Sequence, residues 1–178
     1  NTDVQSVYGI KDTNTSYGNL RNNSKIVEQT ITGSGIKATS GNVKVDFTKD
    51  IGWYFDLKAV SGGGERVNID SIFAAGVLSV ISNVPATSLC TAGGTAWYYQ
   101  IDYLSGGDLG GTNQNIAEKL VGGLAVGQVI IKLGETGAIK NLITDATGKV
   151  TPNVVKKNAN IKSNTVGGDV KRVGWREI

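Results

Sequence analysis

The chain contains no histidine and no methionine, and Cys90 is the single cysteine among its 178 residues. Without histidine, the chain by itself cannot assemble a Ser-His-Asp or Cys-His catalytic centre. It also supplies no imidazole ligand to zinc or iron. One cysteine forms no disulfide within the chain, and in an exported protein it indicates a partner outside the chain. The most familiar catalytic and metal-binding designs are therefore excluded within this chain.

Long apolar runs and proline are also scarce. The chain has 2 Pro, and its longest apolar stretches, such as residues 72–80, are interrupted by Gly or Ser. They are far shorter than the roughly 20 residues that a membrane-spanning helix needs. With 39% hydrophobic and 19% charged residues, the composition is typical of one globular domain. The chain begins with Asn1 and shows no signal peptide, so we expect a processed product or an excised fragment.

The formal net charge is only +3, but the charge is uneven. Residues 149–178 hold 7 Lys and Arg against 2 Asp and Glu, a balance of +5, and they include Lys156, Lys157, Lys162, Lys171 and Arg172. Such a tail would suit nucleic acid, anionic lipid or an acidic partner. Solvated strands and loops explain it more simply, and no nucleic-acid partner is predicted.

Glycine is abundant, at 25 residues, and often occurs in doublets between β-branched runs. This pattern indicates short strands joined by turns. We predict an all-β fold of antiparallel strands, as a sandwich, barrel or propeller. Residues 73–84 also fit a helix, but Gly76 and the Val and Ile content favour a bulged, buried strand pair. Strands are expected at residues 4–10, 25–32, 42–48, 53–58, 65–69, 95–103, 127–133 and 169–178, a hairpin at 138–144 and 149–156, and a helical turn at 115–120.

Several motifs follow one another in an order that resembles the C-terminal propeller of the PilY/PilC family of type IV pilus proteins. They are VQSVYGIKD at 4–12, GWYFDL at 52–57 and GERV at 64–67. Pro85, Cys90 and GGTAWYYQID at 93–102 continue the series, and RVGWREI at 172–178 ends it. Residues 107–170 are not distinctive.

The resemblance implies that residues 1–178 are the C-terminal part of a β-propeller, with a compact β-sandwich-like module as the alternative. It implies a non-enzymatic protein, exported to the bacterial cell surface, pilus tip or outer membrane, that supports pilus assembly and adhesion. The implied partners are minor pilins or other pilus components, a surface or host-cell receptor, and the remaining propeller blades. A carbohydrate binder and a quinoprotein-like enzyme are the alternatives, because propellers host both.

Few residues suggest chemistry. Trp53, Trp97 and Trp175 would suit a stacking platform for sugars or bases, but their strand positions favour packing between sheets. Asp56 and Asp102 would suit an acid–base pair, but strand-end carboxylates usually accept backbone N–H bonds. Glu65 and Arg66 are expected to brace a turn, and Asn14 and Asn22 lie in N-x-S/T sequons.

Calcium occurs in some members of the family, which carry an Asp- and Asn-rich loop. This sequence has no matching D-x-[DN]-x-[DN]-G-x5-E loop. Residues 12–14 and 102–115 are oxygen-rich, but turns explain their Asp, Asn and Gly content equally well. No catalytic, metal-binding or cofactor-binding residue is therefore predicted.

Overall fold

The computed structural model of the chain describes residues 3–33, 36–39, 43–57, 64–86, 93–111, 115–132, 134, 137–161 and 171–172. These residues form three β-sheets, and the one helix among them is the short 3-10 helix η1 (Leu20–Asn22). Within this described part, no helix has the length and apolar character needed to cross a membrane. The predicted all-β class is confirmed.

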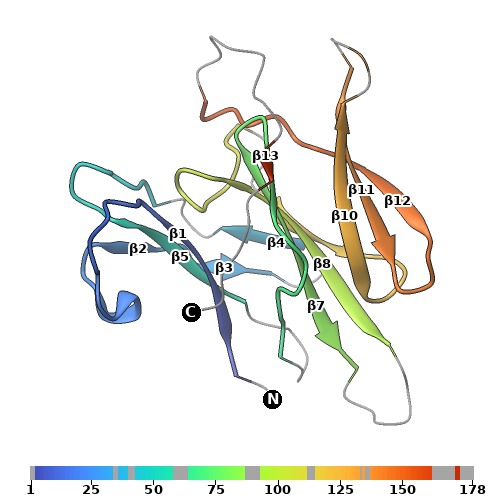
Figure 1. The fold of residues 1–178 in the computed structure, drawn as a ribbon, viewed down its shortest axis with the longest axis horizontal. Coiled ribbons are helices and arrows are strands. Elements are labelled where there is room, and N and C mark those ends of the chain that lie inside the picture. The colour runs from blue at the N-terminus through green and yellow to red at the C-terminus, as the bar shows by residue number, and fades with distance from the viewer. Residues whose placement is uncertain are drawn as a thin grey trace.

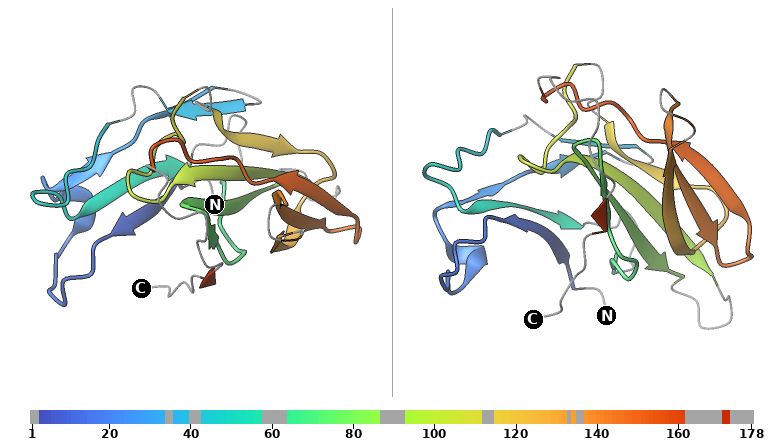
Figure 2. Two further views of the ribbon diagram at one scale, coloured as in Figure 1. Left: turned by 90° about the horizontal axis from the view of Figure 1, so that it is seen from above. Right: turned by 45° about the horizontal axis from the view of Figure 1, so that its top comes forward.

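Seven strands form the central sheet, in the order β13-β6-β7-β8-β9-β4-β3. The N-terminal sheet, β1-β5-β2, and the C-terminal sheet, β10-β11-β12, lie on opposite sides of it (Figure 1, Figure 2). The paired strands are antiparallel except for β2 and β5. The strands are β1 (Gln5–Ile10), β2 (Ile26–Glu28), β3 (Ile31–Thr32), β4 (Ile36–Thr39), β5 (Gly52–Leu57), β6 (Ile72–Ala74), β7 (Val77–Pro85), β8 (Gly94–Asp102), β9 (Asn115–Leu120), β10 (Ala125–Lys132), β11 (Ile139–Asp145), β12 (Val150–Val154) and β13 (Lys171–Arg172).

The β7–β8 hairpin is the centre of the fold because both of its faces are covered. Side chains alternate between the two faces of a strand. Trp97 and Tyr99 of β8 therefore pack with Phe55 of the N-terminal sheet, whereas Tyr98 packs with Ile143 of the C-terminal sheet. A strand that is buried on both faces has little polar alternation, which explains the apolar sequence of β7.

The turn between β6 and β7 shows why residues 73–84 do not form a helix. Ala75 and Gly76 have φ angles of 50° and 75°, as both central residues of a type I′ hairpin turn require. A Cβ at Gly76 would lie 1.9 Å from Cδ1 of Ile161. The predicted strand pair is confirmed, although the register of β6 and β7 contains no bulge.

Six other predicted strands are confirmed to within two residues at each end. They are the strands predicted at 4–10, 53–58, 95–103 and 127–133 and the two strands of the hairpin at 138–156. The strand predicted at 127–133 is less buried than expected, because Val129 is 52% exposed.

The strand predicted at residues 25–32 is wrong as a single element. It is divided into β2 and β3, which belong to different sheets. The two strands separate next to Gln29. Its buried side chain bonds to backbone groups, as a neighbouring strand would. Its Nε2 donates to the carbonyl oxygens of Val43 and Ser105 at 2.5 and 2.8 Å, and its Oε1 accepts from Val43 N at 3.1 Å.

The strand predicted at 42–48 is also wrong over its described residues, 43–48. The backbone N–H and C=O of Val43 are both hydrogen-bonded to the side chain of Gln29, so a neighbouring strand does not pair with them. Asp46 then forms a turn, since its Oδ1 accepts from the backbone N and the hydroxyl of Thr48 at 3.0 and 2.7 Å. Local side-chain bonds of this kind compete with the ladder of a sheet.

The helical turn predicted at 115–120 is wrong, because these residues form β9 between β8 and β4. Ile116 and Ala117 are each 1% exposed, and Glu118 pairs with Tyr98 and Ile36. The strand predicted at 65–69 is reduced to one bridge between Arg66 and Asn83. Of the strand predicted at 169–178, only β13 lies within the described residues.

Three sheets stacked face to face occur both in adjacent propeller blades and in layered sandwiches. The propeller assignment for residues 1–178 therefore stays a prediction, and the sandwich-like alternative is equally compatible with the structure.

Candidate functional site

Two of the three tryptophans are packing residues. Trp53 and Trp97 are 1% and 4% exposed, so neither offers a ring face to a sugar. The indole N–H of Trp53 donates to Tyr103 O at 3.0 Å, and its ring is stacked 6.0 Å from that of Phe55. The prediction of packing between sheets is confirmed for both residues, whereas Trp175 lies outside the described residues.

Asp56 is held by an arginine and a serine. Nη1 and Nη2 of Arg21 donate to the two carboxylate oxygens at 2.5 and 2.6 Å, and Ser6 Oγ donates to Oδ1 at 2.7 Å. The guanidinium also lies 4.9 Å from the ring centroid of Tyr54. The bonds to Asp56 raise the pKa of Arg21 above its ordinary value. Side chains thus supply donors for which the sequence had predicted backbone N–H groups.

Asp102 ends β8 and organises the following loop. Its Oδ1 accepts from the backbone N of Leu104 at 3.1 Å and from Asn158 Nδ2 at 3.2 Å. Its Oδ2 accepts from Ser105 Oγ and Asn160 Nδ2, both at 3.2 Å. The backbone N–H bond predicted for Asp102 is confirmed. Because the carboxylates of Asp102 and Asp56 both accept several hydrogen bonds, neither is placed as a free general base.

The oxygen-rich segments show turn chemistry. Asn14, with a φ of 55°, donates its backbone N–H to Asp12 Oδ1 at 2.8 Å. Asp108 Oδ1 accepts from the backbone N of Gly110 at 2.8 Å. Across the residues that the structure describes, no three His, Cys, Asp or Glu side chains gather into a metal site.

Glu65 is a buried acidic residue whose surroundings the sequence did not reveal. It is 1% exposed, and its Oε1 accepts from Ser82 Oγ at 2.5 Å and from the hydroxyl of Tyr99. Burial, together with this carboxylate, raises the pKa of Tyr99 well above its ordinary value of 10.0. Arg66 donates to the carbonyl oxygens of Asp3 and Glu65, both at 2.9 Å. These residues therefore connect strands and loops rather than bracing a single turn.

Lys156, in the described part of the basic tail, is not a free positive charge. Lys156 donates to Asn115 O and to Glu118 Oε1, both at 3.1 Å, so a carboxylate partly neutralises it. Lys162 lies outside the described residues, as does Cys90. Both sequon asparagines, Asn14 and Asn22, are exposed.

An apolar groove of about 730 Å³, the aromatic groove, lies between β1 and the β6–β8 region. The rings of Phe73 and Tyr103 meet edge to face, with centroids 4.8 Å apart. Ile10, Tyr103 and Leu104 on its rim are 41%, 39% and 43% exposed, which is unusual for adjoining large apolar side chains. Its lining residues are Tyr8, Gly9, Ile10, Lys11, Phe47, Trp53, Phe73, Leu78, Tyr103 and Leu104.

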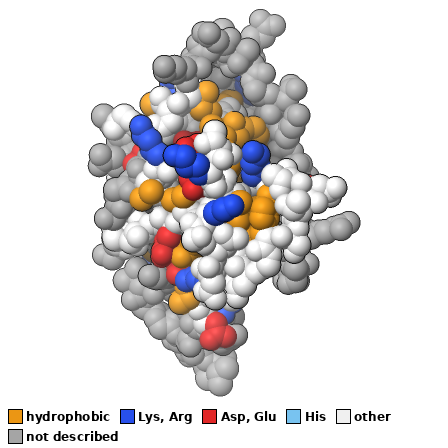
Figure 3. All heavy atoms as spheres, turned by 90° about the vertical axis from the view of Figure 1, so that its left-hand side faces the viewer, with side chains coloured by type: hydrophobic (Ala, Val, Ile, Leu, Met, Phe, Trp, Pro, Cys, Tyr) orange, Lys and Arg blue, Asp and Glu red, His pale blue; other side chains and the backbone are white. Residues whose placement is uncertain are grey.

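The side of the molecule that carries the N-terminal sheet combines apolar and basic groups. Figure 3 shows hydrophobic side chains next to several Lys and Arg side chains on this face, with fewer carboxylates. Apolar contact area bordered by charge suits protein recognition better than catalysis.

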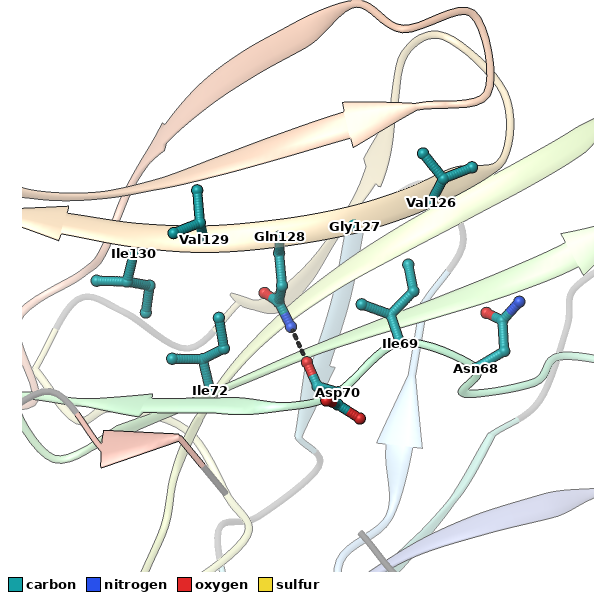
Figure 4. Close-up of a pocket in the computed structure, with 9 residues that line it drawn as sticks. All are labelled: Asn68, Ile69, Asp70, Ile72, Val126, Gly127, Gln128, Val129 and Ile130. Carbon is teal, nitrogen blue, oxygen red and sulfur yellow. Dashed lines mark hydrogen bonds between the residues drawn. The ribbon is translucent and has the colours of Figure 1, made fainter. Parts of the chain in front are cut away.

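A second groove, of about 680 Å³, lies beneath β10 and is called the β10 groove. Figure 4 shows Gln128 and Ile130 pointing from β10 toward residues 69–72, whereas Val126 and Val129 point away. Gln128 Nε2 donates to Asp70 O at 2.7 Å and ties the two walls together. Its lining residues are Asn68, Ile69, Asp70, Ile72, Val126, Gly127, Gln128, Val129 and Ile130.

Sequence reasoning missed both grooves. Tyr103 and Leu104 were assigned to the end of a strand and its turn, and residues 127–133 to a buried strand. The sequence signal for the aromatic groove was Tyr103 and Leu104, the apolar pair directly after β8. The opposite wall of the groove comes from β1, which is far away in the sequence. The β10 groove requires knowing that β10 lies at the edge of its sheet.

The comparisons with known proteins agree with the resemblance seen in the sequence. The chain is 27% identical over 197 residues to a type IV pilus biogenesis factor PilY1 homolog from Xylella fastidiosa. The match covers 100% of this chain and 15% of the relative, so the chain spans about 15% of the length of the protein that it matches. No family model matches the chain, and no solved structure matches it. The similarity supports a relation to PilY1 proteins.

Proposed function

We propose that the chain is a non-enzymatic part of a type IV pilus tip protein that supports pilus assembly. The observation that carries this proposal is the similarity along the whole chain to a type IV pilus biogenesis factor. The exported, surface-exposed location and the propeller architecture of the family belong to the same proposal. Adhesion to a surface or to a host-cell receptor is its second part.

Among the described residues, the side chains considered for chemistry are engaged or buried, which supports a role in protein contact. The carboxylates of Asp56 and Asp102 are engaged with neighbouring donors, and Trp53 and Trp97 are buried. By contrast, the aromatic groove exposes Ile10, and apolar surface of this kind commonly marks a protein interface. Minor pilins and other pilus components are the proposed partners.

Deletion of the gene that encodes the chain tests the proposal. We expect fewer surface pili by electron microscopy and reduced twitching motility, and both should return on complementation. The same deletion in a strain that cannot retract its pili should restore pili if the protein opposes retraction. An unchanged pilus number in the retracting strain would refute the assembly role. Attachment per pilus then tests adhesion separately.

Direct contact is tested with the purified chain. Each minor pilin of the same bacterium is immobilised, and binding is measured by biolayer interferometry. We expect at least one pilin to bind. If none binds, contact with minor pilins through this chain is refuted, whatever the pilus count shows.

A further inference from the structure

The two edges of the C-terminal sheet are built differently. An edge strand presents backbone N–H and C=O groups to any strand that approaches, and proteins usually protect such edges with proline, charge or bulges. The β12 edge is short and contains Pro152, which has no N–H to donate. The β10 edge is longer, and residues 127–131 contain neither proline nor a charged residue. Its protection is confined to its ends, with a register shift near Ala125 and a lysine at Lys132.

The free side of β10 also opens onto a groove. Among the residues that the structure describes, β10 has one sheet neighbour, β11, and its other side faces the β10 groove. Figure 4 shows Ile69 and Ile72 across the groove from β10, and both are half-buried. A strand added beside β10 would place alternate side chains over these two isoleucines. Its remaining side chains would lie beside Val129, which is 52% exposed.

The charges of the sheet indicate the kind of strand that fits. Lys132 lies at the end of β10, Lys140 on β11 and Lys149 just before β12. The one acidic residue in the three strands is Asp145, which is 9% exposed and accepts bonds from Thr147. The sheet therefore combines an apolar edge with a basic border. Because Asp70 lies across the groove from Gln128, in the middle of β10, carboxylates suit the ends of an added apolar strand rather than its centre.

We propose that β10 is a strand-addition site for an extended segment of a partner protein. The segment carries apolar side chains at alternate positions and acidic residues at its ends. Backbone hydrogen bonds to β10 supply affinity, and the β10 groove selects the inward side chains. This inference rests on the proposed function, because it names a second surface, besides the aromatic groove, through which a pilus component would be held.

A synthetic peptide, acetyl-EVTVTVTVE-amide, is the probe. Alternate residues of a strand direct their N–H groups to opposite edges. Two derivatives, N-methylated either at the inner valines or at the threonines, therefore block opposite edges of the peptide. We expect the parent peptide and one derivative to bind, as measured by fluorescence anisotropy, and the other derivative to fail. Equal binding of both derivatives would overturn strand addition, because a purely apolar contact does not distinguish the two edges.

Two matched variants locate the site. Val129→Lys on β10 and Val154→Lys on β12 change residues that are 52% and 57% exposed on the same sheet. Val129→Lys should weaken peptide binding by about fivefold, the upper range for a lost cross-strand pair, and Val154→Lys should leave binding unchanged. Equal effects of the two variants would overturn the assignment to β10.

Hydrogen exchange of the full chain supplies an independent measurement. Peptide binding should slow exchange in residues 125–132, and protection confined to the aromatic groove would overturn the inference. Sedimentation velocity tests whether β10 instead pairs with a second copy. A dimer that Val129→Lys dissociates would also overturn the inference.

Failure of this site and failure of the proposed function give different results. A chain that binds a minor pilin equally well with and without Val129→Lys, and that does not bind the peptide, refutes only the site. A chain that binds the peptide through β10 but has no effect on pili refutes only the pilus function.

Discussion

Replacing Gly9 with alanine should destabilise the protein through the ring of Trp53. An added Cβ would lie 2.3 Å from Cε2 and 2.4 Å from Cζ2 of that ring, well inside the normal contact distance. The ring cannot readily yield, because its N–H donates to Tyr103 O at 3.0 Å and it is stacked on Phe55. Gly106 closes its other side, where an added Cβ would lie 2.3 Å from Cδ2.

The expected loss follows from three contributions, two that lower the free energy of unfolding and one that raises it. Overpacking a core costs about 1–3 kcal/mol, and a displaced indole would also lose a hydrogen bond worth about 1 kcal/mol. Gly→Ala also lowers the conformational entropy of the unfolded chain, which stabilises the folded protein by about 0.4–1 kcal/mol. Gly9→Ala should therefore lower the free energy of unfolding by about 2 kcal/mol, which corresponds to a Tm about 4–8 °C lower.

Urea unfolding followed by tryptophan fluorescence measures the loss, and Gly127→Ala is the matched control. Gly127 also lies in an edge strand, and an added Cβ there meets nothing within 4 Å. The control should be neutral or slightly stabilising. Equal stabilities for the two variants would refute the reasoning. If the clash is with the indole, Gly9→Ala should also cost less when Trp53 is replaced by phenylalanine, because contacting residues give non-additive effects.

Three further predictions concern the buried acid, alkaline stability and the aromatic groove. Glu65→Ala should cost about 1–3 kcal/mol in urea unfolding, because Ser82 and Tyr99 lose their shared acceptor, and Glu65→Gln should cost less. Since burial and Glu65 raise the pKa of Tyr99 above 10.0, the unfolded state loses this proton first. The stability that Tyr99 contributes should be fully present below about pH 10 and should fall as the pH rises toward the folded-state pKa. Tm measured from about pH 8 to 11 should therefore fall less steeply for Tyr99→Phe than for the unchanged protein. Equal slopes would contradict this assignment. Tyr103→Ala should weaken minor-pilin binding, whereas Val121→Ala, at a residue that is 88% exposed and does not line the aromatic groove, should not. Equal binding of both variants would exclude the aromatic groove as the contact.

The sequence could predict the strands whose pattern is local. Aromatic and β-branched residues at 95–103 and the turn residues at 145–148 identify their elements without tertiary information. The errors occur where a distant residue decides the structure. Gln29 bonds to Ser105, 76 residues away, and no local pattern distinguishes this glutamine from an exposed one.

The candidate sites were harder to predict for the same reason. The burial of Trp53 and Trp97 could be inferred from their strand positions, and the structure confirms it. Glu65 meets Tyr99 only after β7 and β8 pair, so its burial has no signature in the motif GERV. Likewise, the exposure of β10 depends on which strand lacks a second neighbour, and sequence periodicity does not specify the order of strands.

The double burial of the central hairpin has a consequence for the order of folding. β7 and β8 join residues that are close in sequence, whereas β4 meets β9 by pairing Ile36 with Glu118. Closing such a long loop is slow, because its entropy is lost before distant contacts form. We expect the hairpin to form first and to act as the template on which both outer sheets assemble. Until they do, its two apolar faces are exposed, and the chain would be most prone to aggregation at that stage.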